Sequence, residues 1–180
     1  MRKRNVLAIV ATVIGLGTAG VATAISASAA QGVYIQVVNS ISGKCADVAG
    51  QSVSPGAFVH QWTCDNDANQ LWFQDTANLP GGRFRLVNKN SGLCMTAPRP
   101  PLAGQVTTVF QWPCGEVPPG FETVSEFQTW SWQPADAGHS VLSSEAGQCL
   151  ALFGVYSARN GWGITVHDCA TTNGQFWHAG

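Results

Sequence analysis

The 180-residue chain has few charged residues: Asp, Glu, Lys and Arg together make up 11% of it. Three of the nine basic residues lie at the extreme N-terminus and the other six are scattered, so Lys and Arg form no cluster along the chain. A protein that binds duplex nucleic acid needs clustered basic residues to displace counterions from the phosphates. The composition therefore argues against nucleic acid as the partner.

Segments with the three-to-four-residue spacing of an amphipathic helix are also scarce. Short runs rich in β-branched and aromatic residues are bounded instead by Gly, Pro, Asn and Ser, a pattern typical of strands. The expected strands are Tyr34–Val38, Phe58–Trp62, Leu71–Gln74, Phe84–Val87, Thr107–Trp112 and Ile164–His167. We therefore predict an all-β fold.

Recognisable catalytic machinery is missing as well. A hydrolase needs paired carboxylates, or a nucleophile with its base. Three glutamates share one Pro- and Gly-containing insertion, which is a poor place to hold two carboxylates at a fixed distance: Glu116, Glu122 and Glu126. His139, His167 and His178 have no neighbouring motif that resembles a nucleophile elbow. We expect the protein not to be an enzyme.

The first 29 residues have the layout of a secretory signal peptide. Basic residues at 2–4 precede an apolar stretch from Val6 to Ile25, and Ala27-Ser28-Ala29 supplies the small residues of a cleavage site. A membrane anchor is the alternative because the apolar stretch approaches a bilayer-spanning length, although three glycines dilute it. We predict a secreted protein that has no membrane contact after cleavage. All ten acidic residues follow the signal, so the remainder carries a net charge of about −4.

Six cysteines in an exported chain indicate disulfides rather than a zinc site or a redox thiol. They form three couples with separations of 19, 20 and 20 positions: Cys45 and Cys64, Cys94 and Cys114, and Cys149 and Cys169. A glycine lies two positions before each first cysteine, at Gly43, Gly92 and Gly147. Because each copy of this pattern most simply closes its own loop, the predicted disulfides are 45–64, 94–114 and 149–169.

A Gln-x-Trp triplet follows each second cysteine and ends at Trp72, Trp130 and Trp177. The gap from cysteine to glutamine is 6 positions in the first and third copies and 14 in the second, which therefore carries an insertion. Units of about fifty residues are too small to bury a core alone, so the three must share one, and we expect these tryptophans inside it. The predicted repeats span about 33–79, 83–134 and 139–180.

The repeated motifs of the chain resemble those of a known family. Gly-x-Cys, then Val-x-Gln-Trp-x-Cys (Val59 to Cys64, Val109 to Cys114), then Gln-x-Trp in triplicate is similar to the ricin B-type lectins. The resemblance covers residues 33–180. It implies a β-trefoil of twelve strands with one potential sugar pocket in each repeat. It also implies that a glycan or polysaccharide is the partner; we expect the protein to act as a monomer.

In that family the pocket takes an Asp two positions after the first cysteine, residues of the strand before the second cysteine, and an Asn-Gln pair. The corresponding residues of the first repeat are Asp47, His60, Trp62, Asn69 and Gln70. A carboxylate can accept two hydroxyls, an amide offers an acceptor and donors, and an aromatic ring suits the apolar face of a sugar. Alternatively, Asp47 caps a turn, His60 is simply solvated, and Gln70 bonds the backbone.

The other two repeats depart from this pattern. In the second, the Asp position holds Thr96 and the Asn position holds Phe127. In the third, these positions hold Ala151 and Gly174, although His167 aligns with Trp62 and is suited to stacking. Loss of the carboxylate removes charge-assisted hydrogen bonds of roughly 1.5–3 kcal/mol. We therefore expect one competent pocket and two degenerate ones.

A metal or other cofactor is not expected. The segment 65–69 begins like the calcium loop of an EF-hand, with the pattern D-x-D-x-N. It has Gln70 where that loop needs Gly, and Thr76 where it needs Glu.

A second hypothesis is a protein-interaction module on a trefoil scaffold, such as a protease inhibitor or a toxin-associated subunit. It would act through the insertion at 115–127, where Phe121 and Phe127 are either exposed anchors or core plugs; we favour plugs. For a lectin, the sequence leaves the sugar open among galactose, xylan-type and mannose-type ligands, because these differ in the direction of one or two hydroxyls.

Overall fold

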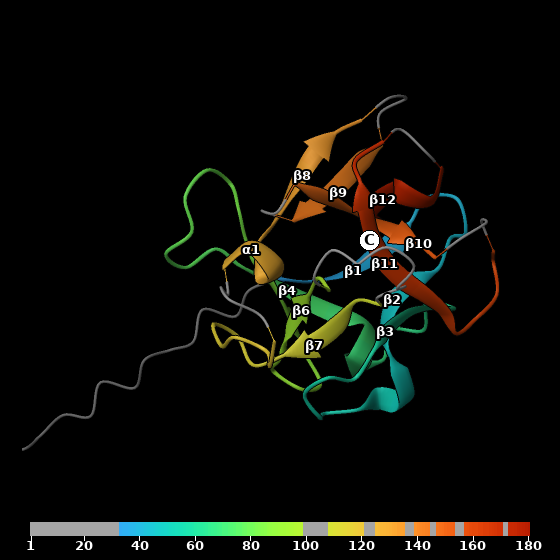
Figure 1. The fold of residues 1–180 in the computed structure, drawn as a ribbon. Helices are drawn as coiled ribbons and strands as arrows, with labels where there is room; N and C mark the ends of the chain where they lie inside the picture. Colours follow the sequence, from blue (N-terminus) through green and yellow to red (C-terminus); the bar gives the residue numbers. More distant parts are fainter. Residues whose placement is uncertain are drawn as a thin grey trace, which may run out of the picture. The chain divides into compact units, whose positions relative to one another are not determined.

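The computed structural model describes residues 33–98, 108–120, 125–135, 139–144, 147–153, 157–170 and 173–180. This part of the chain contains twelve strands and four helices of one turn or less (Figure 1). The strands are β1 (Tyr34–Asn39), β2 (Cys45–Val48), β3 (Val59–Trp62), β4 (Leu71–Asp75), β5 (Arg85–Asn88), β6 (Cys94–Thr96), β7 (Phe110–Trp112), β8 (Trp130–Pro134), β9 (Ser140–Ser144), β10 (Gln148–Leu152), β11 (Trp162–Asp168) and β12 (Trp177–Ala179). The helices are the 3-10 turns Ala49–Gln51, Ala68–Gln70 and Asn173–Gln175, and α1 (Ser125–Gln128).

Six strands close a barrel. β1 pairs with β4 and β12, β4 pairs with β5, β9 pairs with β8 and β12, and a bridge between Phe84 and Trp130 joins the β5 and β8 sides. The other six strands form three antiparallel hairpins, β2–β3, β6–β7 and β10–β11. A barrel with three hairpins, one from each repeat, is a β-trefoil, so the predicted fold is confirmed.

The three hairpins meet at Val59, Val109 and Ile164, which occupy the same position in their repeats. The amide of Val59 donates to the carbonyl of Val109 at 2.7 Å, and the amide of Val109 donates to the carbonyl of Ile164, also at 2.7 Å. All three side chains are buried. This contact joins the hairpins backbone to backbone, so residues of neighbouring repeats come within reach of one another.

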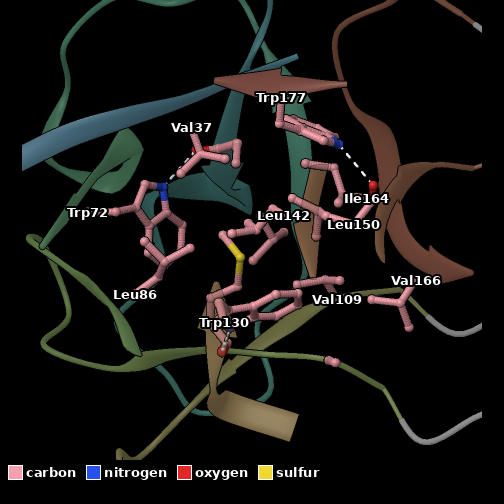
Figure 2. Close-up of a cluster of buried hydrophobic side chains, with 14 of the residues drawn as sticks. Val37, Trp72, Leu86, Val109, Trp130, Leu142, Leu150, Ile164, Val166 and Trp177 are labelled. Carbon is pink, nitrogen blue, oxygen red and sulfur yellow. Dashed lines mark hydrogen bonds between the residues drawn. The ribbon is translucent and has the colours of Figure 1, made fainter. Parts of the chain in front are cut away.

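The three tryptophans of the Gln-x-Trp triplets lie in one shared core (Figure 2), as predicted. Trp72, Trp130 and Trp177 are completely buried. Each indole N–H donates to the carbonyl of the residue after the first cysteine of its repeat, at distances of 2.9–3.1 Å: Ala46, Met95 and Leu150. Because a buried Trp must satisfy its N–H, the same bond recurs in every repeat.

The three predicted disulfides are present, at Cys45–Cys64, Cys94–Cys114 and Cys149–Cys169. The expected strands also match observed ones, with ends that coincide or differ by up to three residues. Thr107 and the predicted signal peptide, residues 1–29, lie outside the described residues. Among the helices of the described part, none is long and apolar enough to cross a membrane.

Candidate functional site

One hollow of about 320 Å³ opens at the hairpin of the first repeat. The antiparallel pairing of β2 with β3 places Asp47 opposite His60, and alternation along β3 puts Trp62 on the same face as His60. The helical turn after the second cysteine brings in Asn69. Asp47, His60, Trp62 and Asn69 therefore line the same hollow, and four of the five predicted site residues come together there.

Asp47 is the centre of a hydrogen-bond network and is 5% exposed. Its Oδ2 accepts from Nδ2 of Asn69 and from Nε2 of Gln70, both at 2.9 Å, and its Oδ1 lies 2.9 Å from Nε2 of His60. A carboxylate offers about four acceptor positions, so three partners leave one, on Oδ1. Asp47 is thus a rigid acceptor with one free position rather than an open carboxylate.

Gln70 has a structural role, because both N–H groups of its side-chain amide donate within the protein and neither remains for a ligand. It is completely buried, and its Nε2 donates to Asp47 and to the carbonyl of Thr63, while its Oε1 accepts the amide of Asp65 at 3.0 Å. Gln128 and Gln175 bond the backbone on either side of their second cysteines in the same way. The reading of Gln70 as a backbone-bonding residue is thus the one that the structure favours. Its contribution to the hollow is to hold Asp47.

His60 and Trp62 form an aromatic wall. Their ring centroids are 5.4 Å apart with an interplanar angle of 20°, so the rings stack. Trp62 is 39% exposed. The ring of His60 contacts Asp47 through Nε2, and no described residue bonds its Nδ1. The wall therefore combines an exposed apolar ring with a free polar atom.

Asn69 brings an unpaired acceptor. Its Nδ2 donates to Asp47 and to the carbonyl of Val48 at 3.1 Å, which fixes the orientation of the amide. Its Oδ1 is buried and has no hydrogen-bond partner among the described residues. A buried polar atom without a partner costs roughly 1–3 kcal/mol. Because this oxygen is buried, the part that Asn69 plays in the hollow is to hold Asp47 through Nδ2.

The hollow is also lined by four residues that were not predicted from the sequence: Gly50, Gln51, Asp65 and Asp67. Gln51 adopts a φ of 53°, a left-handed conformation that costs a non-glycine residue roughly 1–2 kcal/mol. Its Nε2 donates to Asp67 at 2.9 Å, and its carbonyl accepts from Asn90 at 2.8 Å. Strain held by such bonds is typical of functional sites. The sequence carries a signal only for Asp65 and Asp67, which belong to the acidic segment that begins like a calcium loop.

The equivalent positions of the other repeats lack this network. Thr96 is buried, and its hydroxyl takes the place of a carboxylate oxygen by accepting from Nε2 of Gln128 at 3.2 Å. Phe127 is 8% exposed and belongs to the core, as predicted for a plug. Ala151 is buried and apolar, and Gly174 has no side chain. Phe121 and Glu122 of the insertion lie outside the described residues.

Clusters of three or more His, Cys, Asp or Glu that are able to hold a metal ion do not occur in the described part of the chain. The three carboxylates of the hollow belong to Asp47, Asp65 and Asp67. Asp65 accepts the amide of Asp67 at 3.0 Å, and Asp67 accepts from Gln51. Hydrogen bonds thus satisfy part of this negative charge, and the rest makes the hollow acidic.

The β-trefoil and its hollow define a class of protein, and comparison with known proteins identifies the family. The model of the ricin-type beta-trefoil lectin domain-like family matches residues 24–118, which is more than half of the chain. The protein belongs to this family. No curated protein sequence matches the chain.

Several solved structures share the fold. A designed threefold-symmetric protein, ThreeFoil, is 23% identical with a TM-score of 0.65, over 81% of this chain and 96% of that one. A ricin B-like lectin of Macrolepiota procera, solved with lactose, is 15% identical with a TM-score of 0.63, over 82% and 94% of the two chains. An exo-beta-1,3-galactanase of Clostridium thermocellum is 23% identical with a TM-score of 0.66, over 81% of this chain but only 29% of that one. The lectin fold of this protein indicates carbohydrate binding.

Proposed function

We propose that the protein is a secreted, non-catalytic lectin whose main sugar pocket is the hollow of the first repeat. The observation that carries the proposal is the meeting of an exposed indole and a fixed carboxylate in one hollow, Trp62 and Asp47. A sugar ring has an apolar face and a polar edge, and the hollow offers a surface for each.

The polar edge of the ligand would meet two acceptors. These are the free position on Oδ1 of Asp47 and the Nδ1 of His60. Hydroxyls on neighbouring sugar carbons can donate to such a set together. Because Asp47 is held by three donors before any ligand arrives, little conformational entropy is lost when it accepts a hydroxyl.

The same geometry favours binding over catalysis. A general base must be free to take a proton from a reacting group, whereas both oxygens of Asp47 already accept hydrogen bonds. Asp65 and Asp67 are likewise bonded to neighbouring groups. The proposed ligand is a neutral glycan, bound by a monomer outside the cell.

Replacement of Trp62 by Ala tests the proposal with little effect on folding, because the side chain is 39% exposed and does not belong to the shared core. Retention of the mature, oxidised protein on immobilised lactose, xylan and mannan is measured, after a glycan array has ranked the sugars. We expect the loss of about 1–2 kcal/mol of binding free energy, or roughly tenfold in affinity.

The matched control is Tyr34→Ala. Tyr34 is 45% exposed and lies on β1, a barrel strand that pairs with neither β3 nor β7. Its retention should equal that of the wild type. Equal retention of Trp62→Ala and the wild type on every matrix would refute the proposal.

A further inference from the structure

A row of outward-facing rings leads away from the hollow along β3. Side chains alternate on this strand, with Val59 and Gln61 buried. Phe58, His60 and Trp62 therefore share the opposite, outward face. Phe58 is 60% exposed, which is unusual for a large aromatic side chain on a sheet.

The row continues into the second repeat. Phe58 forms an antiparallel bridge with Phe110, the residue that begins β7. The amide of Val59 donates to the carbonyl of Val109 at 2.7 Å, and that of Gln111 donates to Ala57 at 2.9 Å. The bridged residues therefore do not bond each other, and in such a pair the Cα atoms are only about 4.5 Å apart with their side chains on the same face.

The second half of the row lies on β7. Gln111 is buried, so Phe110 and Trp112 lie on the opposite face of β7; both are half-buried, and their ring centroids are 6.4 Å apart. Because β3 and β7 run antiparallel, Trp62 and Trp112 extend in opposite directions from the Phe58–Phe110 bridge. We call these five residues the aromatic strip: Trp62, His60, Phe58, Phe110 and Trp112.

The strip is longer than one sugar ring. Four residues of β3 and two of β7, at about 3.3 Å per residue, give roughly 20 Å. Glycines flank both ends: Gly161 lies beside the ring of Trp62, and the amide of Gly56 donates to Gln111, at the Trp112 end. A Cβ added at Gly56 would meet no described atom within 4 Å.

We propose that the aromatic strip binds a linear, neutral polysaccharide, with one unit in the hollow and its neighbours on the rings of Phe58, Phe110 and Trp112. This proposal rests on the proposed function and names its substrate class, an internal stretch of a chain rather than a single terminal sugar. Two features argue for this occupant. The strip shares His60 and Trp62 with the hollow, and it contains no Asp, Glu, Lys or Arg.

The hydrogen-bonding groups offered to a ligand are at one end of the strip, on Asp47 and His60. Sugar identity would therefore be read in the hollow, and the rings would add affinity through contacts that tolerate any sugar with an apolar face. Affinity should consequently rise with chain length, up to the number of units that fit on the strip.

The test compares Phe58→Ala with the wild type on oligosaccharides of one to six units, in series built on galactose, xylose and mannose, by NMR titration. We expect the wild type to bind the longest members of the preferred series at least tenfold more tightly than the single sugar. Phe58→Ala should bind the single sugar as the wild type does, and the six-unit chain about three- to tenfold more weakly. Tyr34→Ala, an exposed aromatic residue off the strip, should match the wild type throughout.

The outcomes separate the two proposals. Equal binding of the six-unit chain by Phe58→Ala and the wild type overturns the strip, as does an equal loss for the single sugar and the long chain. If sedimentation shows that Phe58→Ala dissociates a dimer and chain-length dependence is unchanged, a second copy covers the strip and the proposal is wrong. Failure of Trp62→Ala to weaken single-sugar binding overturns the proposed function itself.

Discussion

The first repeat and the other two differ in their pockets and agree in their folding contacts. Every repeat has a buried Trp bonded to the same carbonyl position and a Gln bonded across its second cysteine. Only in the first does that Gln also hold a carboxylate, that of Asp47. Repetition therefore marks the residues that make the trefoil, and departure from repetition marks the pocket.

Replacing a core tryptophan should have the largest effect, and a similar one in each repeat. Trp72→Ala, Trp130→Ala and Trp177→Ala each empty a large buried volume and leave a carbonyl without its donor. We expect losses of about 3–5 kcal/mol in the free energy of unfolding, measured with urea under oxidising conditions. If one of the three variants lost much less free energy of unfolding than the others, the folding contacts of the three repeats would not be equivalent.

The glutamines should separate folding from binding. Gln70→Ala, Gln128→Ala and Gln175→Ala each remove two hydrogen bonds to the backbone, at about 0.5–1.5 kcal/mol of stability per bond. Because only Gln70 also holds Asp47, only Gln70→Ala should weaken glycan retention as well. Retention below the melting transition is the measurement, and equal losses for all three variants would show that Gln70 has no special part in the pocket.

Asp47→Thr gives the first repeat the residue that the second repeat has at this position, Thr96. The new hydroxyl can still accept from Gln70, as Thr96 does from Gln128. Stability should therefore fall less than in Asp47→Ala, which leaves Asn69 and Gln70 without their acceptor. Binding should weaken by roughly 1.5–3 kcal/mol because the charge-assisted bonds are gone. Thr96→Ala is the control: isothermal titration should give the wild-type affinity for it.

The smallest effect concerns ligand charge. Asp47, Asp65 and Asp67 make the hollow acidic, so an anionic glycan should bind more weakly than its neutral parent. We expect a sialylated lactose to bind a few-fold more weakly than lactose at low salt, and the difference to shrink as salt screens the charges. Preference for the sialylated form would contradict the assignment of a neutral ligand.

The sequence predicted the trefoil well because its determinants repeat. The positions of Cys45, Trp72 and their counterparts recur three times, and recurrence selects both the disulfides and the core. The pocket came instead from the resemblance to the ricin B-type lectins, and Asp47 and Trp62 share one hollow because they lie on the paired strands β2 and β3.

Other features of the pocket depend on turns and could not be predicted. Gln51 reaches the hollow only because its backbone is left-handed, and Asp67 only because the turn after Cys64 folds back toward it. The hydrogen bonds that Asp47 accepts could not be predicted from the sequence either, because they depend on the rotamers of Asn69 and Gln70. The Phe58–Phe110 bridge required knowledge of how two repeats meet.

The most direct test of the account is the indole region of a nitrogen–proton NMR spectrum, in which each of the seven tryptophans contributes one signal. With the neutral sugar that the array ranks first, supplied as a single unit, we expect the Trp62 signal to move most and the signals of buried Trp72, Trp130 and Trp177 to stay in place. Saturating shifts confined to other indoles, with Trp62 unmoved, would contradict the claim that the first repeat holds the sugar.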